Sequence, residues 1–228
     1  MDKNELFQLA WYKIFDSHQT RFSKSPNLQI YYRTMLSQIK LAKRFGKVDL
    51  CILGDSNAHN LGTYENMRKF GKIGLSINLA IPGSRADHWL HFFHSENGKK
   101  VYSEIKDSKI LWNIGGNHII QKDMERLEIK LQKLFSLFSK SYNCLVPPIW
   151  SRHMHFLGPE LEINQQIQIC NTYIKKIWKT HAIDTYSIFL NWDKTEPFIL
   201  THKDLVHFSK IGDDIRIPII LFSLLFIP

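Results

Sequence analysis

The strongest constraint on the fold is the alternation of short apolar runs with longer amphipathic ones. Five short runs, residues 48–53, 73–80, 109–114, 143–149 and 182–189, are apolar and bounded by polar residues, glycine or proline, which is typical of strands. The segments between them, 58–70, 87–107, 122–140 and 160–179, have helical composition. Strands that are apolar throughout and separated by helices predict a three-layer α/β/α sandwich around a mostly parallel five-stranded sheet.

The first 46 residues precede the first predicted strand. Apolar residues recur there at helical spacing in two stretches, Phe7, Trp11 and Phe15, then Tyr32, Met35, Leu36 and Ile39. Two amphipathic helices are therefore expected. We divide the chain into an N-terminal helical extension packed on the core, residues 1–46, and a main domain, residues 47–228. The apolar stripes are expected to face the core, with a substrate lid or a docking surface as the alternative.

Residues able to carry chemistry follow the strands in a fixed order. The four signals are Gly54-Asp55-Ser56 after the first strand, Gly83 after the second, Asn117 behind Gly115-Gly116 after the third, and Asp204-Leu205-Val206-His207 near the C-terminus. The carboxyl ends of parallel strands share one edge of a sheet, so the first three should converge there. A Ser on a sharp turn can present its hydroxyl, and an Asp three residues before a His can hold the imidazole as a general base.

These signals, in this order, resemble the SGNH hydrolases, also called the GDSL esterase/lipase family, over roughly residue 48 to the C-terminus. The resemblance implies a flavodoxin-like strand order 2-1-3-4-5. It implies that Ser56 is the nucleophile and that Asp204 and His207 complete a catalytic triad. It also implies an oxyanion hole made by the N–H groups of Ser56 and Gly83 and the side-chain amide of Asn117. The sequence departs from the family at Asn57, where the family name has Leu, and at His118, where many members carry Asp.

The predicted function is that of a serine esterase acting through an acyl-enzyme on a short acyl group carried by a polar or carbohydrate alcohol. An O-acyltransferase that uses the same acyl-enzyme and a non-catalytic glycan-binding protein with the same cleft are the alternatives. The short-acyl preference rests on the missing signal peptide, the unpaired cysteines and the polar or charged residues Asn57, Arg85, His118 and Arg152 expected beside the cleft. Trp150 is a further residue expected to line it. These candidate substrate contacts are Asn57, Arg85, His118, Trp150 and Arg152.

No cofactor and no metal are expected. The glycine-rich nucleotide motifs are missing, as is the Gly-x-Ser-x-Gly elbow of α/β-hydrolases around Ser56. The pair His153 and His155 lacks a cysteine or carboxylate partner at a recognisable metal-ligand spacing.

Charge and cysteine content bear on partners and compartment. The formal net charge is +9, but the cations are dispersed among acids, which predicts solvated helix faces and no nucleic-acid partner. Three cysteines show no paired spacing, and the polar N-terminus lacks a signal-peptide pattern, so we expect a cytoplasmic protein.

The apolar run 217–228 is shorter than the roughly 20 residues of a membrane-spanning helix. It is expected to pack on the sheet, with peripheral membrane contact left open. The oligomeric state is not predicted.

Overall fold

A computed structural model describes residues 3–17, 27–138, 140–148, 160–190 and 208–227. Its centre is a five-stranded sheet in the order β2-β1-β3-β4-β5, with every neighbouring pair parallel. The strands are β1 (Leu50–Gly54), β2 (Ser76–Asn78), β3 (Lys109–Asn113), β4 (Ser141–Cys144) and β5 (Ala182–Ile183). The α/β class and the 2-1-3-4-5 order are therefore confirmed.

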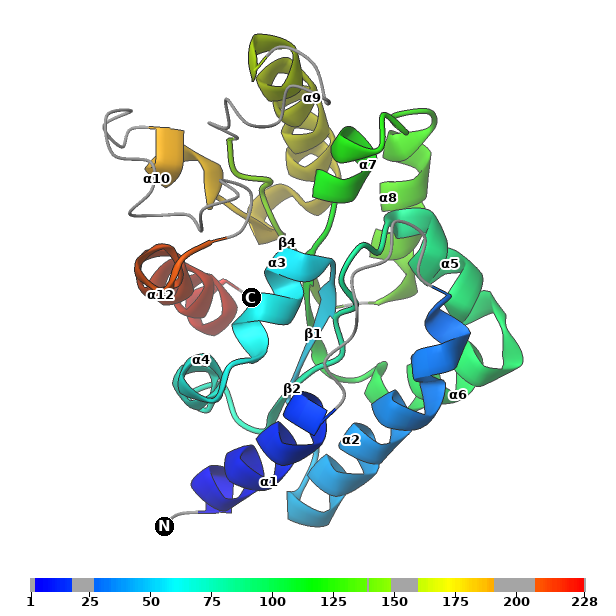
Figure 1. Ribbon diagram of the computed structural model, residues 1–228, viewed down its shortest axis with the longest axis vertical. Coiled ribbons are helices and arrows are strands. Elements are labelled where there is room, and N and C mark those ends of the chain that lie inside the picture. Colours follow the sequence, from blue (N-terminus) through cyan, green and yellow to red (C-terminus); the bar gives the residue numbers. More distant parts are fainter. Residues whose placement is uncertain (1–2, 18–26, 139, 149–159, 191–207, 228) are drawn as a thin grey trace.

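Helices cover both faces of this sheet (Figure 1). The helices between and after the strands are α3 (Ser56–His59), α4 (Tyr64–Phe70), α5 (Ala86–His94), α6 (Glu96–Ile105), α7 (Gly116–Ile120), α8 (Leu127–Leu137), α9 (Glu160–Trp178), α10 (Tyr186–Leu190) and α12 (Lys210–Phe226); the 3₁₀ turns are η2 (Asn60–Gly62) and η4 (Lys179–His181). The pair α4 and α12 lies on one face, and α5, α6, α8 and α9 lie on the other.

Several predicted bounds differ from the structure: β2, β4 and α8 are shorter than the predicted runs 73–80, 143–149 and 122–140. Three other predicted elements are divided, each because a side chain caps a helix. The run 182–189 is not one strand, since the carboxylate of Asp184 accepts hydrogen bonds from the N–H groups of Tyr186 and Ser187 and starts α10. The predicted helix 87–107 is divided at Ser95, whose hydroxyl accepts from the N–H of Gly98. The predicted helix 58–70 is divided at Thr63, which caps α4.

The N-terminal helices α1 (Lys3–Ser17) and α2 (Tyr32–Phe45), with the 3₁₀ turn η1 (Leu28–Tyr31), lie at the β2 edge of the sheet. Phe7, Trp11 and Ile39 are fully buried, which confirms that their apolar stripes face the core. The side-chain amide of Gln8 donates to the carbonyl of Ser76 at 3.3 Å. This contact uses a backbone group of an edge strand, where unpaired groups otherwise invite strand addition. The domain boundary after residue 46 stays a prediction.

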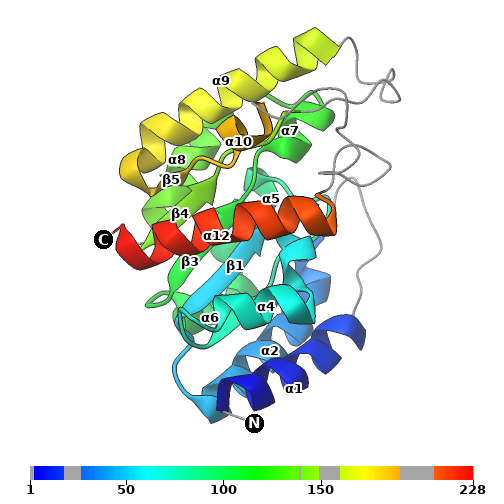
Figure 2. The same ribbon diagram turned by 90° about the vertical axis from the view of Figure 1, so that its left-hand side faces the viewer.

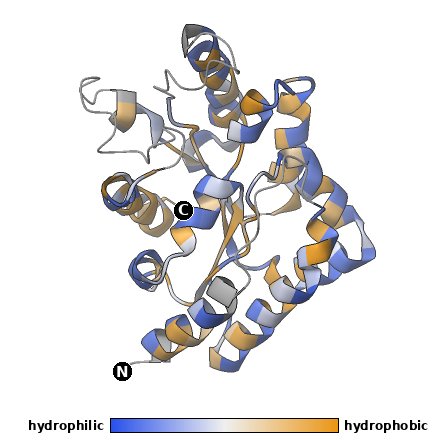
Figure 3. Ribbon diagram, in the orientation of Figure 1, coloured by the Kyte–Doolittle hydropathy of each residue, from blue (hydrophilic) through white to orange (hydrophobic). Residues whose placement is uncertain are grey.

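The C-terminal helix α12 crosses the face of the sheet beside α4 (Figure 2). The helix continues through Pro218, which is exposed. The side chains of Ile217, Ile220 and Leu224 are buried, so the apolar run packs as expected. Apolar residues occur along most of its length (Figure 3), and Phe222 and Phe226 are exposed near its end. Among the residues described, no helix is long and apolar enough to cross a membrane.

Candidate active site at the carboxyl edge of the sheet

The chain leaves β1 at a glycine that no other residue could replace without strain. Gly54 has a φ of 135°, and a Cβ placed on it would lie 2.1 Å from the carbonyl oxygen of Asn113 on β3. The next residue, Asp55, still donates its N–H to that carbonyl at 3.1 Å. Helix α3 then starts at once, so Ser56 lies directly above the carboxyl end of β1.

The cap of this short helix is Asp55. Its buried carboxylate accepts a hydrogen bond from the N–H of Asn57 at 2.9 Å, so Ser56 is the first residue of the helix and not its cap. Two further bonds tie α3 to the end of β2. The amide of Asn78 donates to the carbonyl of Ala58 at 2.7 Å, and Nδ1 of His59 lies 3.2 Å from the carbonyl of Ala80. Helix α3 is thus fixed at both ends.

Gly83 occupies a tight turn that docks on the end of β1. Its φ is 79°, and the N–H of Ser84 donates to the carbonyl of Ile81 at 3.1 Å, which with Pro82 at the preceding position gives a type II turn. The hydroxyl of Ser84 donates to the carbonyl of Gly54 at 2.6 Å. Gly83 is therefore held beside the β1 turn that carries Ser56.

Asn117 joins the same group from the end of β3. Gly115 has a φ of 134°, and a Cβ there would lie 2.7 Å from the sulfur of Cys170, so this position also requires glycine. Asn117 is 5% exposed, and its side-chain amide donates one hydrogen to the carbonyl of Ser84 at 3.1 Å. An amide has two such hydrogens, and no residue in the described part of the chain accepts the second one, so a donor remains for a ligand at this edge.

The structure therefore brings together three of the four sequence signals, and Ser84 connects them. Sequence reasoning missed both Ser84 and Asn78. The signal for Asn78 was present, since it is a polar residue inside an apolar strand-like run; Ser84 had none beyond its place after the turn. Asp204, His207, Trp150 and Arg152 lie outside the described residues, so the triad and two candidate substrate contacts stay predictions.

His118 has contacts that favour a positioning role over the substrate contact expected from the sequence. It is fully buried, its Nε2 accepts from the N–H of Ala86 at 3.0 Å, and its Nδ1 lies 3.0 Å from the carbonyl of Asp123. Burial lowers the pKa of His118 to about 4, so the ring is neutral at pH 7. A neutral ring donating from Nδ1 and accepting at Nε2 satisfies both bonds and holds the start of α5 on α7.

Arg85 lies at the rim of the site, and its side chain is held on both flanks. Its guanidinium donates to both carboxylate oxygens of Asp87, at 3.1 and 2.8 Å, and to the side-chain oxygen of Gln121 at 2.6 Å. It helps to line a pocket of about 390 Å³ together with Asp87, His88 and His91. Substrate contact by Arg85 stays a prediction, as does contact by the half-buried Asn57.

A cluster next to Arg85 has metal-ligating residue types but is already neutralised. Among the described residues, Asp87, His118 and Asp123 place potential ligand atoms within 4.8 Å of one another. Burial raises the pKa of Asp87, but the hydrogen bonds and charge of Arg85 outweigh it and lower the pKa to about 2. Lys130 donates to both oxygens of Asp123, at 3.3 and 3.1 Å. A metal ion would compete with two cations, so we assign this cluster to ion pairing.

Solved structures resemble the chain in fold. A lipase/acylhydrolase from Enterococcus faecalis gives a TM-score of 0.58 at 16% identity, covering 77% of this chain and 96% of that one. A candidate SGNH hydrolase from Slackia heliotrinireducens gives 0.59 at 13% identity, covering 78% and 99%. An acetylxylan esterase from Geobacillus stearothermophilus gives 0.56 at 16% identity, covering 78% and 94%.

At these identities the likeness establishes a fold of the SGNH hydrolase type, which confirms the expected resemblance at the level of structure. No protein-family model matches the sequence, and no curated protein matches it either.

The burial of His118 predicts a pH-dependent stability. Its pKa rises from about 4 in the folded chain to about 6.5 on unfolding, so the unfolded chain binds more protons between these values. Above pH 6.5 the ring is neutral in both states and does not lower the free energy of unfolding. As the pH falls toward 4, the free energy of unfolding is expected to decrease by up to roughly 3 kcal/mol. Urea titrations at several pH values measure this loss.

The matched variant is His118→Asn, which removes the titrating ring. Burial also lowers the pKa values of His59 and His88, so the comparison with this variant isolates the contribution of His118. A variant whose stability falls with pH as steeply as that of the unmodified chain would contradict the assignment.

Proposed function

We propose that the chain is a serine ester hydrolase that works through an acyl-enzyme. The observation that carries the proposal is the joining of the Ser56 turn, the Gly83 turn and Asn117 through Ser84 at one edge of the sheet. A nucleophile and donors for an oxyanion are the groups that acyl transfer requires at one point. The likeness in fold to a lipase/acylhydrolase and an acetylxylan esterase supports the same class of reaction.

In the proposed reaction the Ser56 hydroxyl attacks the ester carbonyl while His207 accepts its proton. Asp204 holds the imidazole in the tautomer that can take this proton. The negative charge that develops on the carbonyl oxygen is met by the N–H groups of Ser56 and Gly83 and by the second amide hydrogen of Asn117. Collapse of this intermediate expels the alcohol, which takes the proton from His207. Water then attacks the acyl-enzyme by the same route and releases the acid.

The hydrogen bonds around the described part of the site support this chemistry because they fix the donors before substrate arrives. Preorganised donors lower the barrier because they need no reorientation as charge develops. Asn117 is fixed by Ser84, Ser84 by Gly54, and the helix of Ser56 by Asp55 and Asn78. All of these groups are at or next to strand ends, which are rigid supports for a site.

We further propose that the substrate is a short acyl ester of a polar alcohol. Most of the residues that line the two described pockets are polar or charged. The 390 Å³ pocket at Arg85 contains two histidines and an ion pair, and a second, of about 560 Å³, is lined by Tyr12, Asn60, Thr63, Tyr64, Glu65, Asn66, Phe208, Lys210 and Asp213. Such surfaces suit hydroxyl-rich carriers better than a long alkyl chain. The expected compartment remains the cytoplasm.

The nucleophile is tested with Ser56→Ala. The variant is expected to lose labelling by a fluorophosphonate probe and hydrolysis of p-nitrophenyl acetate, while its circular dichroism stays unchanged, since Ser56 is the only nucleophile in the mechanism. Activity at the level of the unmodified chain in a folded variant would rule the mechanism out. An unmodified chain that hydrolyses no ester and takes no probe would contradict the proposed function itself.

The oxyanion hole is tested with Asn117→Ala. Loss of one such donor typically lowers turnover by about 10²–10³-fold, and we expect a loss of that size here. The matched control is Asn171→Ala, because the buried Asn171 amide also bonds backbone, to the N–H and carbonyl of Val146. The control should lose stability but keep turnover within a few fold. Equal losses in both variants would mean that Asn117 acts through folding alone.

The substrate class is tested by the length of the acyl group. Values of kcat/KM for acetyl, butyryl, octanoyl and palmitoyl esters of one alcohol are expected to be highest at acetyl or butyryl, because most of the residues that line the described pockets are polar or charged. A maximum at octanoyl or beyond would contradict the short-acyl proposal without affecting the assignment of Ser56.

A further inference from the structure

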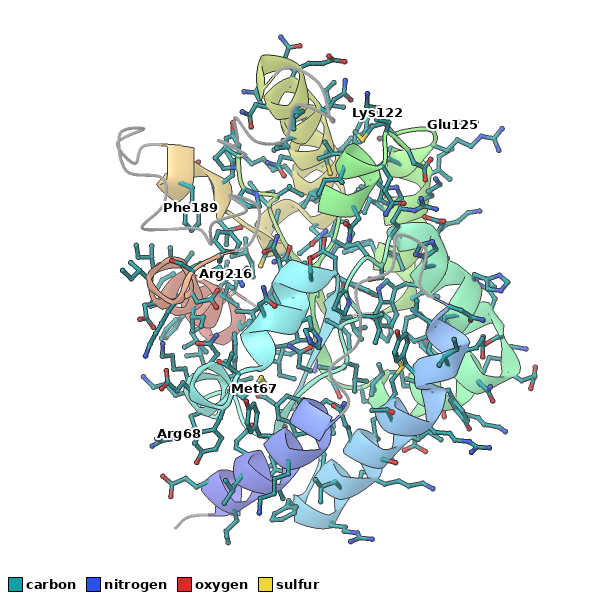
Figure 4. All side chains as sticks on the ribbon, viewed as in Figure 1. Met67, Arg68, Lys122, Glu125, Phe189 and Arg216 are labelled. Carbon is teal, nitrogen blue, oxygen red and sulfur yellow. The ribbon has the colours of Figure 1, made fainter. Side chains whose placement is uncertain are left out.

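Helix α12 contributes a fully buried arginine to the underside of the candidate site. Arg216 has no exposed surface, and its side chain lies between α12 and α3 (Figure 4). Its Nε donates to the carboxylate of Asp213 at 2.6 Å, and its Nη2 donates to the backbone carbonyl of Asn57 at 2.9 Å. The guanidinium carbon lies 3.9 Å from the centre of the Phe208 ring, a stacked cation–π geometry.

These contacts reach the chain neighbours of two residues in the proposed triad. Asn57 follows Ser56 in the sequence and belongs to the same four-residue helix. Phe208 follows His207. A helix this short leaves its last carbonyls without partners inside the helix, and Arg216 supplies a donor for one of them. One rigid planar group therefore fixes the backbone beside the nucleophile and the ring beside the base.

Stability alone gives little reason for a charge at this place. Burying a guanidinium is costly, and well-packed apolar residues often replace a buried ion pair without loss of stability. Among the described residues, Nη1 of Arg216 has no hydrogen-bond partner, so the burial is not fully compensated. The partner Asp213 is buried too, and it accepts a second bond from the amide of Asn66 on α4 at 3.1 Å. The network thus spans α12, α3 and α4.

We propose that Arg216 is a positioning residue that sets the distance between the nucleophile helix α3 and Phe208, the residue that follows His207 in the chain. This inference rests on the proposed function and adds a residue to it. Arg216 touches no reacting atom; it acts through Asn57 and Phe208. Its loss lowers turnover because the reacting groups depart from their productive geometry, while substrate binding, which uses other residues, changes little. Misplacement by about 1 Å can lower a rate by roughly 100-fold.

The test compares Asp213→Asn with Asp213→Asn/Arg216→Met. The double variant removes the guanidinium without leaving a buried unpaired carboxylate, and an asparagine at 213 can still accept from Asn66. Relative to the single variant, kcat for p-nitrophenyl acetate and the rate of fluorophosphonate labelling are expected to fall by about 10- to 100-fold, with KM within about threefold. Arg68→Met changes an exposed arginine of α4, whose side chain points to solvent (Figure 4), and should leave kcat unchanged.

The variant Arg216→Lys provides the rescue measurement. Its ammonium can pair with Asp213 but cannot also stack on Phe208 and reach Asn57, so its kcat should lie between those of the unmodified chain and the double variant. If the double variant does not fold, a folded lysine variant must show about a tenfold loss. Rates are normalised to folded protein by circular dichroism. An unchanged kcat in either folded variant, or a loss of rate that disappears after normalisation, would overturn the role of Arg216. The proposed function is tested separately, by the activity of the unmodified chain.

Discussion

The close approach of Gly54 to the carbonyl of Asn113 determines where the chain leaves the sheet, and the candidate site is built around that point. Because β1 and β3 are in direct register there, a side chain on Gly54 would collide with the neighbouring strand. The backbone therefore turns at the last paired residue, and α3 starts two residues later with Ser56. Gly115, at the end of β3, meets the same kind of restriction from Cys170. Two neighbouring strands thus end in glycine turns of positive φ, and both turns deliver a polar side chain to one edge.

Buried polar groups then lock these turns together. The hydroxyl of Ser84 accepts from the indole N–H of Trp89 while it donates to Gly54, and the carbonyl of Ser84 accepts from Asn117. These groups are buried and hydrogen-bonded to one another, and hydrogen-bonded networks in a low-dielectric interior are rigid. The same logic applies to His118, whose ring bonds two backbone groups on different elements. The proposed esterase mechanism needs donors that are held rigidly. The hydrogen bonds that pack this edge of the sheet are the same ones that hold those donors.

The other side of the site depends on α12. This helix covers the sheet beside α4 through an apolar face, yet it carries the buried ion pair of Asp213 and Arg216. The guanidinium carbon of Arg216 lies 3.9 Å from the ring centre of Phe208, the residue that follows His207. Tyr142, on β4, donates its hydroxyl to the carbonyl of Ile227 at 2.8 Å, which fixes the far end of the same segment. Contacts near both of its ends therefore fix the described C-terminal segment, residues 208–227.

Sequence alone determined the fold class, the order of the strands through the family resemblance, and the meeting of Ser56, Gly83 and Asn117 at one edge. It could do so because apolar periodicity and strand-ending glycines are local properties of the chain. The ends of strands were harder to predict from the sequence, as the cap at Asp184 shows, because capping depends on the rotamer of a single side chain. Only the tertiary structure revealed the roles of Ser84, His118 and Arg216. Their partners lie 30, 32 and 159 positions away along the chain, and a hydrogen bond between residues so far apart leaves no periodic pattern in the sequence.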